Sequence, residues 1–283
     1  MRLVSLLEGS NATAAMVVGN RVVPLSRLDP LLPADLTEIV LHWPRFRDRL
    51  RWLDAAQLGG IPLREVRLGI PFEPPRILGT GGNYRDHLGE LHTERTPEAP
   101  SAFLKLPGSA QGPEVPLALA PADACVDYEG EIALVIGAPA RDLPTERAHE
   151  AIAGLMLAND VSARDAPLSH VTLAKGGRGF CPLGPWLVTT DELDLGNVSF
   201  TVEVNGEPRQ SASSATMIHT FAEIVASYSR AIPLEPGDVV LTGTPAGVGL
   251  ARRPPAFLRP GDVVVIDSPQ LGTLRTPIVA TDA

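Results

Sequence analysis

From residue 70 onward the chain consists of short apolar runs bounded by glycine and proline, and this punctuation limits the fold more than any other feature. Runs with strand character occupy 76–79, 102–105, 131–136, 186–189, 198–204 and 239–242. The motif Pro-Gly-Asp-Val-Val occurs at 236–240 and again at 260–264. Each copy is a turn that leads into a strand, so we expect the two units to pack near each other. Many short strands joined in this way favour a sandwich, roll or barrel.

Helical periodicity is clear in one later segment, where apolar residues between Met217 and Tyr228 recur at the spacing of a core-facing helix. The first 70 residues differ in pattern. Strands are expected at 3–7, 14–18 and 21–24, with a hairpin at Gly19-Asn20. Helices are expected at 35–42 and 46–57.

Prolines at 62, 71, 74 and 75 mark a boundary near residue 70. The sequence therefore predicts a β-rich α+β protein. A small N-terminal α/β domain would span residues 1–70, and a larger strand-rich domain would span residues 71–283.

Composition excludes several classes of protein. The net charge is -9 and the basic residues form no block, so a nucleic-acid partner is not expected. No segment approaches the roughly 20 apolar residues that a membrane span needs, and the apolar run at the start is too short for a signal peptide. Cys125 and Cys181 lie far apart, which argues against a disulfide framework. We expect a cytoplasmic protein.

The segment Asp127-Tyr-Glu-Gly-Glu-Ile-Ala-Leu-Val-Ile-Gly137 carries the strongest chemical signal. In an extended strand, Glu129 and Glu131 project from the same face. Two such carboxylates repel unless they are solvated, one is protonated, or a cation lies between them. The apolar run that follows makes full solvation unfavourable, although this segment alone leaves an acidic strand end on the surface open. Oxygen donors without His or Cys favour Mg²⁺, Mn²⁺ or Ca²⁺ over zinc.

Two further segments bring polar side chains next to apolar runs. Asp160 follows the apolar stretch 151–157 in Ala-Asn-Asp-Val-Ser-Ala-Arg-Asp, and the alternative is a turn in which Asp160 and Arg164 only cap and pair. The glycine-rich turn at 79–82 leads into an expected helix, where His87 and Glu90 share a face at i, i+3. A His oriented by a carboxylate can take a proton from water. A plain surface contact is the alternative.

Five motifs together carry a family resemblance. In chain order they are DYEGEIALVIG, ANDVSARD, FCPLGPW, VNGEPRQ and LEPGDVVLTGTPAGVG. Over about residues 70 to 270 the chain resembles the fumarylacetoacetate hydrolase family, and the first 70 residues resemble the leading domain of its bacterial two-domain members. The resemblance implies a mixed β-sandwich roll, a divalent ion, usually Mg²⁺, at the mouth of the roll, and a homodimer.

The resemblance also implies roles for individual side chains. It assigns metal ligation to Glu129, Glu131 and Asp160, water activation to His87 and Glu90 on a helix that closes as a lid, and substrate contact to Lys175, Thr244 and Gln210. Mg²⁺ is the expected ion, with Mn²⁺ and Ca²⁺ as alternatives. The stretch 176–179 is richer in glycine than is usual in the family, and Arg178 within it adds a charge that can meet a substrate carboxylate.

The implied activity is hydrolysis of a C–C bond in an acylpyruvate- or fumarylpyruvate-like β-diketo acid through a metal-bound enolate. Hydrolysis is preferred because His87 and Glu90 are both present. One alternative is an isomerase, tautomerase or decarboxylase of a 2-oxo-dioate, of the 2-hydroxyhepta-2,4-diene-1,7-dioate isomerase or oxaloacetate type. Another is a catalytically silent binding protein of the same fold. In each case the expected partner is a small oxo-acid.

Overall fold

The computed structural model describes residues 1–9, 11–53, 59–93, 96–120, 125–166 and 170–281. The large sheet contains β1 (Arg2–Glu8), β2 (Asn11–Val18), β3 (Arg21–Pro24), β4 (Ile61–Pro62), β5 (Ile77–Gly81), β6 (Ser101–Lys105), β7 (Ala110–Gln111), β10 (Gly130–Ile136), β11 (Ile152–Asn159), β13 (Cys181–Thr189) and β16 (Val239–Leu241). The second sheet contains β8 (Leu117–Leu119), β14 (Ser199–Val204), β15 (Glu207–Ser213), β17 (Val263–Ser268) and β18 (Gly272–Ala280). A small pair is formed by β9 (Val126–Asp127) and β12 (Ser162–Ala163).

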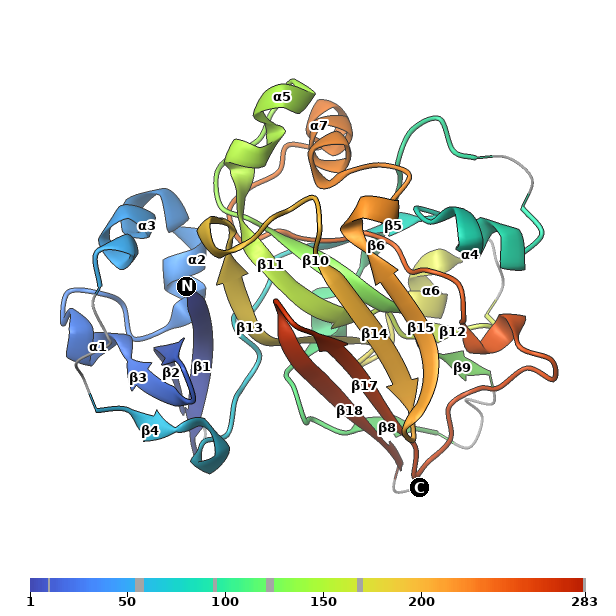
Figure 1. Cartoon of the computed structure of the whole chain (residues 1–283), viewed down its shortest axis with the longest axis horizontal. Coiled ribbons are helices and arrows are strands. Elements are labelled where there is room, and N and C mark those ends of the chain that lie inside the picture. The colour runs from blue at the N-terminus through green and yellow to red at the C-terminus, as the bar shows by residue number, and fades with distance from the viewer. Residues whose placement is uncertain (10, 54–58, 94–95, 121–124, 167–169, 282–283) are drawn as a thin grey trace.

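Helices are short and lie around the sheets (Figure 1). They are α1 (Leu25–Leu28), α2 (Leu36–Leu41), α3 (Trp43–Arg51), α4 (Arg85–Glu90), α5 (Thr145–Ala148), α6 (Val171–Lys175) and α7 (Phe221–Ala231). Turns of 3-10 helix lie at Leu63–Glu65, Pro107–Ser109, His149–Ala151, Thr190–Glu192, Ser214–Thr216 and Gly249–Ala251. Within the described ranges, no helix is long and apolar enough to cross a membrane.

The two sheets face each other, with β14, β15, β17 and β18 in front of β10, β11 and β13 (Figure 1). Strand order in the large sheet is β4-β3-β2-β1-β13-β11-β10-β16-β5-β6, with β7 beside β13. The order in the second sheet is β15-β14-β17-β18-β8. Parallel and antiparallel pairs occur in both sheets. The predicted β-rich mixed roll is confirmed.

The strand β10 contributes side chains to two of the three hydrophobic clusters in the described structure. Side chains alternate along a strand, so successive residues enter different layers. Ile132 and Leu134 join the core between the two sheets. Ala133 and Val135 belong instead to a second core, on the other face of the large sheet. All residues of β10 are buried, which explains why this run is continuously apolar after Glu131.

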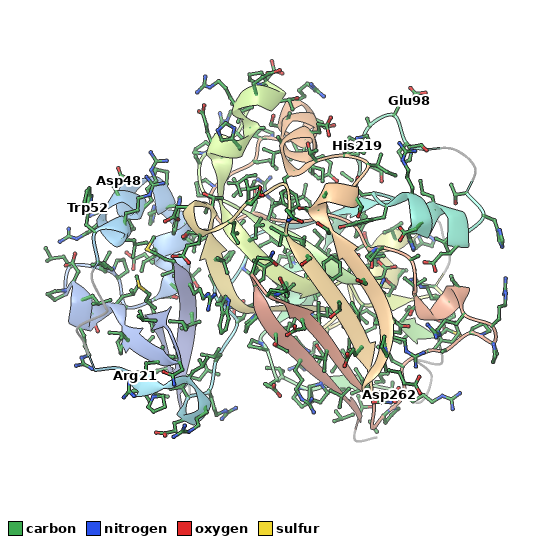
Figure 2. All side chains as sticks on the ribbon, in the orientation of Figure 1. Arg21, Asp48, Trp52, Glu98, His219 and Asp262 are labelled. Atoms are coloured by element: carbon green, nitrogen blue, oxygen red, sulfur yellow. The ribbon has the colours of Figure 1, made fainter. Side chains whose placement is uncertain are left out.

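The N-terminal segment contains the expected strands and helices, and residues 54–57 of the second expected helix lie outside the described residues. Its strands extend the large sheet, because Leu3 of β1 pairs with Leu187 of β13. Trp43 and Phe46 pack into the core on the face of this sheet, while Asp48 and Trp52 point outward (Figure 2). The division into domains 1–70 and 71–283 stays a prediction.

The start of one expected helix differs from the prediction, and the two Pro-Gly-Asp-Val-Val units lie in different sheets. The helix expected from Met217 begins at Phe221, because Thr220 caps it in a reciprocal capping box with Glu223. The two Pro-Gly-Asp-Val-Val turns lead into strands of different sheets, β16 and β17, which do not pair. Val240 of β16 and Val264 of β17 both belong to the core between the two sheets, so the two units lie in different sheets and contribute to one core.

Candidate active site

Glu129, Glu131 and Asp160 meet at one end of the large sheet. Strands β10 and β11 are antiparallel and Gly130 lies opposite Asn159, so the start of β10 lies beside the end of β11. The Asp160 backbone N–H donates to the Glu129 carbonyl oxygen at 2.8 Å. One oxygen from each carboxylate lies within 4.8 Å of the others, and all three residues are buried. The alternative of solvated surface acids is therefore wrong.

Gly130, between the two glutamates, allows this arrangement. A Cβ atom at this position would lie 2.3 Å from Val202 Cγ2 and 3.3 Å from the Phe200 ring. Only glycine lets the first residue of β10 pass this close to β14. The spacing Glu-Gly-Glu thus places both carboxylates on one face while the residue between them packs against the second sheet.

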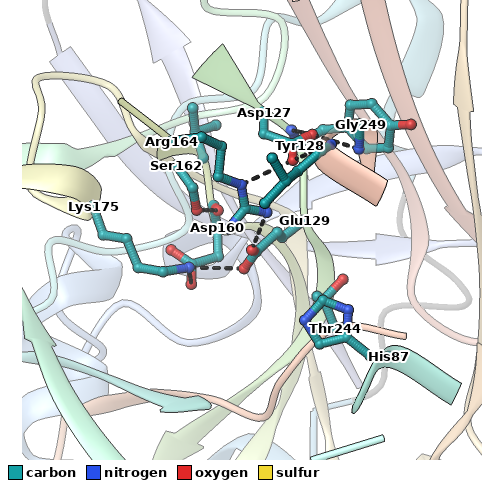
Figure 3. Close-up of polar contacts among 12 residues, drawn as sticks. His87, Asp127, Tyr128, Glu129, Asp160, Ser162, Arg164, Lys175, Thr244 and Gly249 are labelled. Atoms are coloured by element: carbon teal, nitrogen blue, oxygen red, sulfur yellow. Dashed lines mark hydrogen bonds and ion pairs between the residues drawn. The ribbon is translucent and has the colours of Figure 1, made fainter. Parts of the chain in front are cut away.

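Two cations reach the triad from separate segments (Figure 3). Lys175, the last residue of α6, donates to Glu129 Oε2 at 2.7 Å and to Asp160 Oδ2 at 2.6 Å. Arg164 donates to Glu129 Oε1 at 2.6 Å and to Asp127 Oδ2 at 2.9 Å. The sequence pattern indicates Arg164 only as a pairing residue of a turn, and it indicates no role for Asp127.

A third cation, Lys105 at the end of β6, was also missed. Its side chain is fully buried and its Nζ lies 2.5 Å from Asp160 Oδ1. The sequence does contain a signal for it. Among 24 lysine and arginine residues, only Lys105 and Lys175 are lysines, and both contact Asp160.

The surrounding charges shift the pKa values of Glu129 and Glu131 in opposite directions. Burial opposes ionisation of Glu129, but Lys175 and Arg164 outweigh it and hold the pKa of this carboxyl well below its usual value. Burial, reinforced by the negative charges of Asp160 and Glu129, raises the pKa of Glu131 well above its usual value. In the described part of the chain no cation pairs with Glu131; its Oε2 accepts the Gly243 N–H at 2.6 Å. Gly243 has φ of +95°, a conformation that suits glycine.

These donors fit a hard divalent cation. Three buried carboxylates converge, and Glu131 lacks a counter-charge that an ion would provide. Lys175 stays charged beside them, because Asp160, Glu129 and Glu131 outweigh the effect of burial and raise the pKa of its ammonium. The face of the Phe103 ring lies 5.1 Å from the same ammonium, which adds a cation–π contact.

His87 and Glu90 form a pair on α4. His87 Nδ1 lies 2.7 Å from Glu90 Oε1, and Glu90 Oε2 accepts the Gly247 N–H at 2.8 Å. Because an ionised carboxylate can only accept, the Nδ1 atom carries the hydrogen of this contact, and Nε2 is the ring nitrogen that remains for proton transfer. Glu90 is thus held at both oxygens, and it orients the imidazole.

A cavity of about 180 Å³ lies between His87 and the triad. It is lined by Thr80, Gly81, Gly82, His87, Phe103, Glu129, Glu131, Asp160, Arg164, Lys175 and Thr244. An imidazole and a set of metal-type ligands therefore line one cavity, an arrangement that can polarise a bound molecule and move one of its protons.

Three of the residues expected to contact substrate, Thr244, Gln210 and Arg178, lie in three different settings. Thr244 lines the cavity, but its hydroxyl donates to the Gly130 carbonyl oxygen at 2.9 Å. Gln210 is buried behind it and uses its amide N–H groups on Thr244 Oγ1 and the Pro245 carbonyl oxygen. Arg178 is exposed and does not line the cavity in the described part of the chain. Gln210 therefore positions Thr244, and the structure does not bring Arg178 to the site.

Comparison with known proteins gives consistent matches. The model of the fumarylacetoacetate hydrolase C-terminal family matches residues 76–279. Oxaloacetate tautomerase Fahd2a, mitochondrial, of Rattus norvegicus is 36% identical over 99% of this chain and 92% of its own. The structure of fumarylacetoacetate hydrolase from psychrophilic Exiguobacterium antarcticum is 34% identical, with a TM-score of 0.88 over 99% of this chain and all of its own.

A third relative was solved with ligands. Maleylpyruvate hydrolase from Sphingobium sp. SYK-6, in complex with manganese(II) and pyruvate, is 25% identical, with a TM-score of 0.82 over 100% of both chains. These matches span nearly the whole of this chain and include proteins named for hydrolysis and for tautomerisation.

Proposed function

Because the chain belongs to the fumarylacetoacetate hydrolase family, we propose that it is a metal-dependent enzyme that moves a proton on a small 2-oxo acid, and that oxaloacetate is the first substrate to test. One observation carries the proposal: His87, oriented by Glu90 through Nδ1, lines the same cavity as the three carboxylates. The relative in Rattus norvegicus is named for oxaloacetate tautomerisation, which favours this reaction over the hydrolysis expected from the sequence.

Glu129, Glu131 and Asp160 would hold the ion, and we propose Mg²⁺, with Mn²⁺ as a substitute. Such an ion supplies Lewis acidity, which lowers the cost of negative charge on a carbonyl oxygen. The Mn²⁺ in the maleylpyruvate hydrolase structure supports this choice of ions.

The proton transfer uses His87. The C–H bond next to the oxo group breaks, its electron pair forms the C=C bond of the enol, and the π pair of the C=O bond moves onto the oxo oxygen. The proton passes to His87 Nε2 and then to that oxygen, which gives the enol. Glu90 stabilises the imidazolium formed in between, because its Oε1 accepts the Nδ1 hydrogen.

Lys175 stabilises the charge that develops on the substrate. Its ammonium has three N–H donors, and two of them point to Glu129 and Asp160. The third is available for a substrate oxygen, because Lys175 lines the cavity. A charged donor in a buried site of this kind is a strong source of transition-state stabilisation.

Hydrolysis of a β-diketo acid is the second candidate. The same His87–Glu90 pair can activate a water molecule instead of a C–H bond, and this observation favours it. Products separate the two reactions, since hydrolysis yields two acids and tautomerisation changes only the spectrum.

The proposal is tested by following ultraviolet enol absorbance with oxaloacetate, acetylpyruvate and fumarylpyruvate, in Mg²⁺ or Mn²⁺ and in chelator. We expect metal-dependent tautomerisation of oxaloacetate with no new acid detected by mass spectrometry. Cleavage of the β-diketo acids alone would support the second candidate. If no oxo-acid is turned over, the protein is a silent binding protein of the same fold.

His87→Ala should lower the tautomerisation rate by about a hundredfold, the usual effect of losing a general base. Mn²⁺ affinity should not change, since His87 bonds to Glu90 and not to the triad. Stopped-flow absorbance measures the rate and calorimetry the affinity. His42→Ala on the exposed end of α2 is the control, and a rate in His87→Ala equal to that of this control would contradict the role of the base.

We also propose, on the family resemblance, that the protein is a homodimer. Sedimentation equilibrium should give twice the mass of one chain. A single-chain mass at micromolar concentration would contradict this.

A further inference from the structure

Each carboxylate of the triad has one oxygen held by a donor other than Lys175. These contacts are Arg164 Nη2 to Glu129 Oε1 at 2.6 Å, the Gly243 N–H to Glu131 Oε2 at 2.6 Å, and Lys105 Nζ to Asp160 Oδ1 at 2.5 Å. The opposite oxygens of Glu129 and Asp160 both face the Lys175 ammonium at the cavity. An ion that displaces the Lys175 ammonium would meet these opposite oxygens, while the other oxygen of Asp160 stays bonded to Lys105, so Asp160 would present one oxygen to the ion.

Lys105 is the most informative of the three donors. Its side chain is fully buried, and Asp160 is the carboxylate it contacts, while its second contact is the Val161 carbonyl oxygen at 3.4 Å. Arg164 is shared between Glu129 and Asp127, and the Gly243 donor is backbone. A change at Lys105 therefore frees one oxygen of one ligand and leaves the contacts of both glutamates in place.

The number of oxygens that a carboxylate presents selects among hard cations. Ca²⁺ takes six to eight oxygen ligands at about 2.3–2.6 Å and readily binds both oxygens of one carboxylate. Mg²⁺ is smaller, demands near-octahedral geometry, and keeps several waters beside one or two carboxylate oxygens. Buried groups that orient a ligand from behind commonly tune a metal site in this way.

We propose that Lys105 is a positioning residue that restricts Asp160 to one metal-facing oxygen, and that it thereby makes the site favour Mg²⁺ and Mn²⁺ over Ca²⁺. This inference rests on the metal site of the proposed function. It favours Mg²⁺ and Mn²⁺ over Ca²⁺, a choice that the sequence leaves open. Lys105 does not line the cavity in the described structure, so it acts on the ion only through Asp160.

The test is calorimetric titration of the metal-free full-length protein with Mn²⁺ and with Ca²⁺. The wild type should bind Mn²⁺ more tightly. Lys105→Met keeps the length of the side chain and removes the ammonium. We expect it to lower Mn²⁺ affinity by about 10- to 100-fold and Ca²⁺ affinity by less, so that the preference for Mn²⁺ narrows by about tenfold or more.

Two variants isolate the cause. Lys105→Arg retains a charged donor and should restore much of the Mn²⁺ preference. Arg141→Met removes one positive charge from an exposed pair with Glu235, and should leave the preference unchanged. The wild-type preference is itself a test that does not depend on whether Lys105→Met folds.

The outcomes separate this inference from the proposed function. Equal affinity of the wild type for Ca²⁺ and Mn²⁺, or an unchanged preference in folded Lys105→Met, overturns the role of Lys105 and leaves the metal site intact. Failure of the wild type to bind either ion overturns both proposals.

Discussion

Glu131→Gln should abolish divalent-metal binding and lower turnover by about a thousandfold, because the Lewis acidity that it removes is worth several kcal/mol in the transition state. The same change should make the metal-free protein more stable than the wild type. Glu131 is buried beside Asp160 and Glu129, which raise its pKa together with burial. A neutral amide removes this repulsion and can still accept the Gly243 N–H.

The stability effect has a measurable size. A gain of about 1 kcal/mol corresponds to a rise of about 2–4 °C in Tm for a protein of this size class. Thermal denaturation in chelator should show this rise, and added Mn²⁺ should raise the Tm of the wild type only. Glu235→Gln on the surface serves as the matched control. Full activity of chelator-treated wild type, or Mn²⁺ stabilisation of Glu131→Gln, would contradict the assignment.

Lys175→Met should cause a large loss of stability in the metal-free protein. Removal of one partner from a buried ion pair costs about 3–5 kcal/mol, and Lys175 pairs with both Glu129 and Asp160. A divalent ion can replace part of the lost positive charge, so the Tm of this variant should depend more steeply on Mn²⁺ than that of the wild type. Turnover should remain low even when the ion is bound, because the substrate loses its charged donor.

Urea denaturation with and without Mn²⁺ measures the effect, and Arg147→Met in an exposed pair with Glu150 is the control. If Lys175→Met is as stable as this control in chelator, the ammonium does not balance the triad. If its activity is restored fully by Mn²⁺, Lys175 does not act on the substrate.

Local patterns were enough to predict much of the site. Alternation along a strand places Glu129 and Glu131 on one face, and the structure brings them together with Asp160. Helical spacing identified α7 and also the pairing of His87 with Glu90. The β-rich architecture followed from the distribution of turns, because turn residues mark where strands begin.

Contacts between segments far apart in the sequence could not be predicted from local patterns. Lys105 contacts the triad from β6, and Arg164 contacts it from the turn after β12. No local sequence pattern predicts which distant residues such long side chains contact. The sequence also gave no indication that β1 would pair with β13 and so join the N-terminal strands to the large sheet. Arg178 was expected at the cavity because of its charge, yet the backbone leaves it exposed.

We expect Glu129, Glu131 and Asp160 to bind one hard divalent ion together. Anomalous diffraction from crystals grown in Mn²⁺ locates such an ion. One manganese peak should lie about 2.1 Å from one oxygen of each carboxylate, a distance typical of small octahedral cations. A fully occupied manganese peak at another site in the same crystals, with no peak among these three side chains, would contradict this metal site.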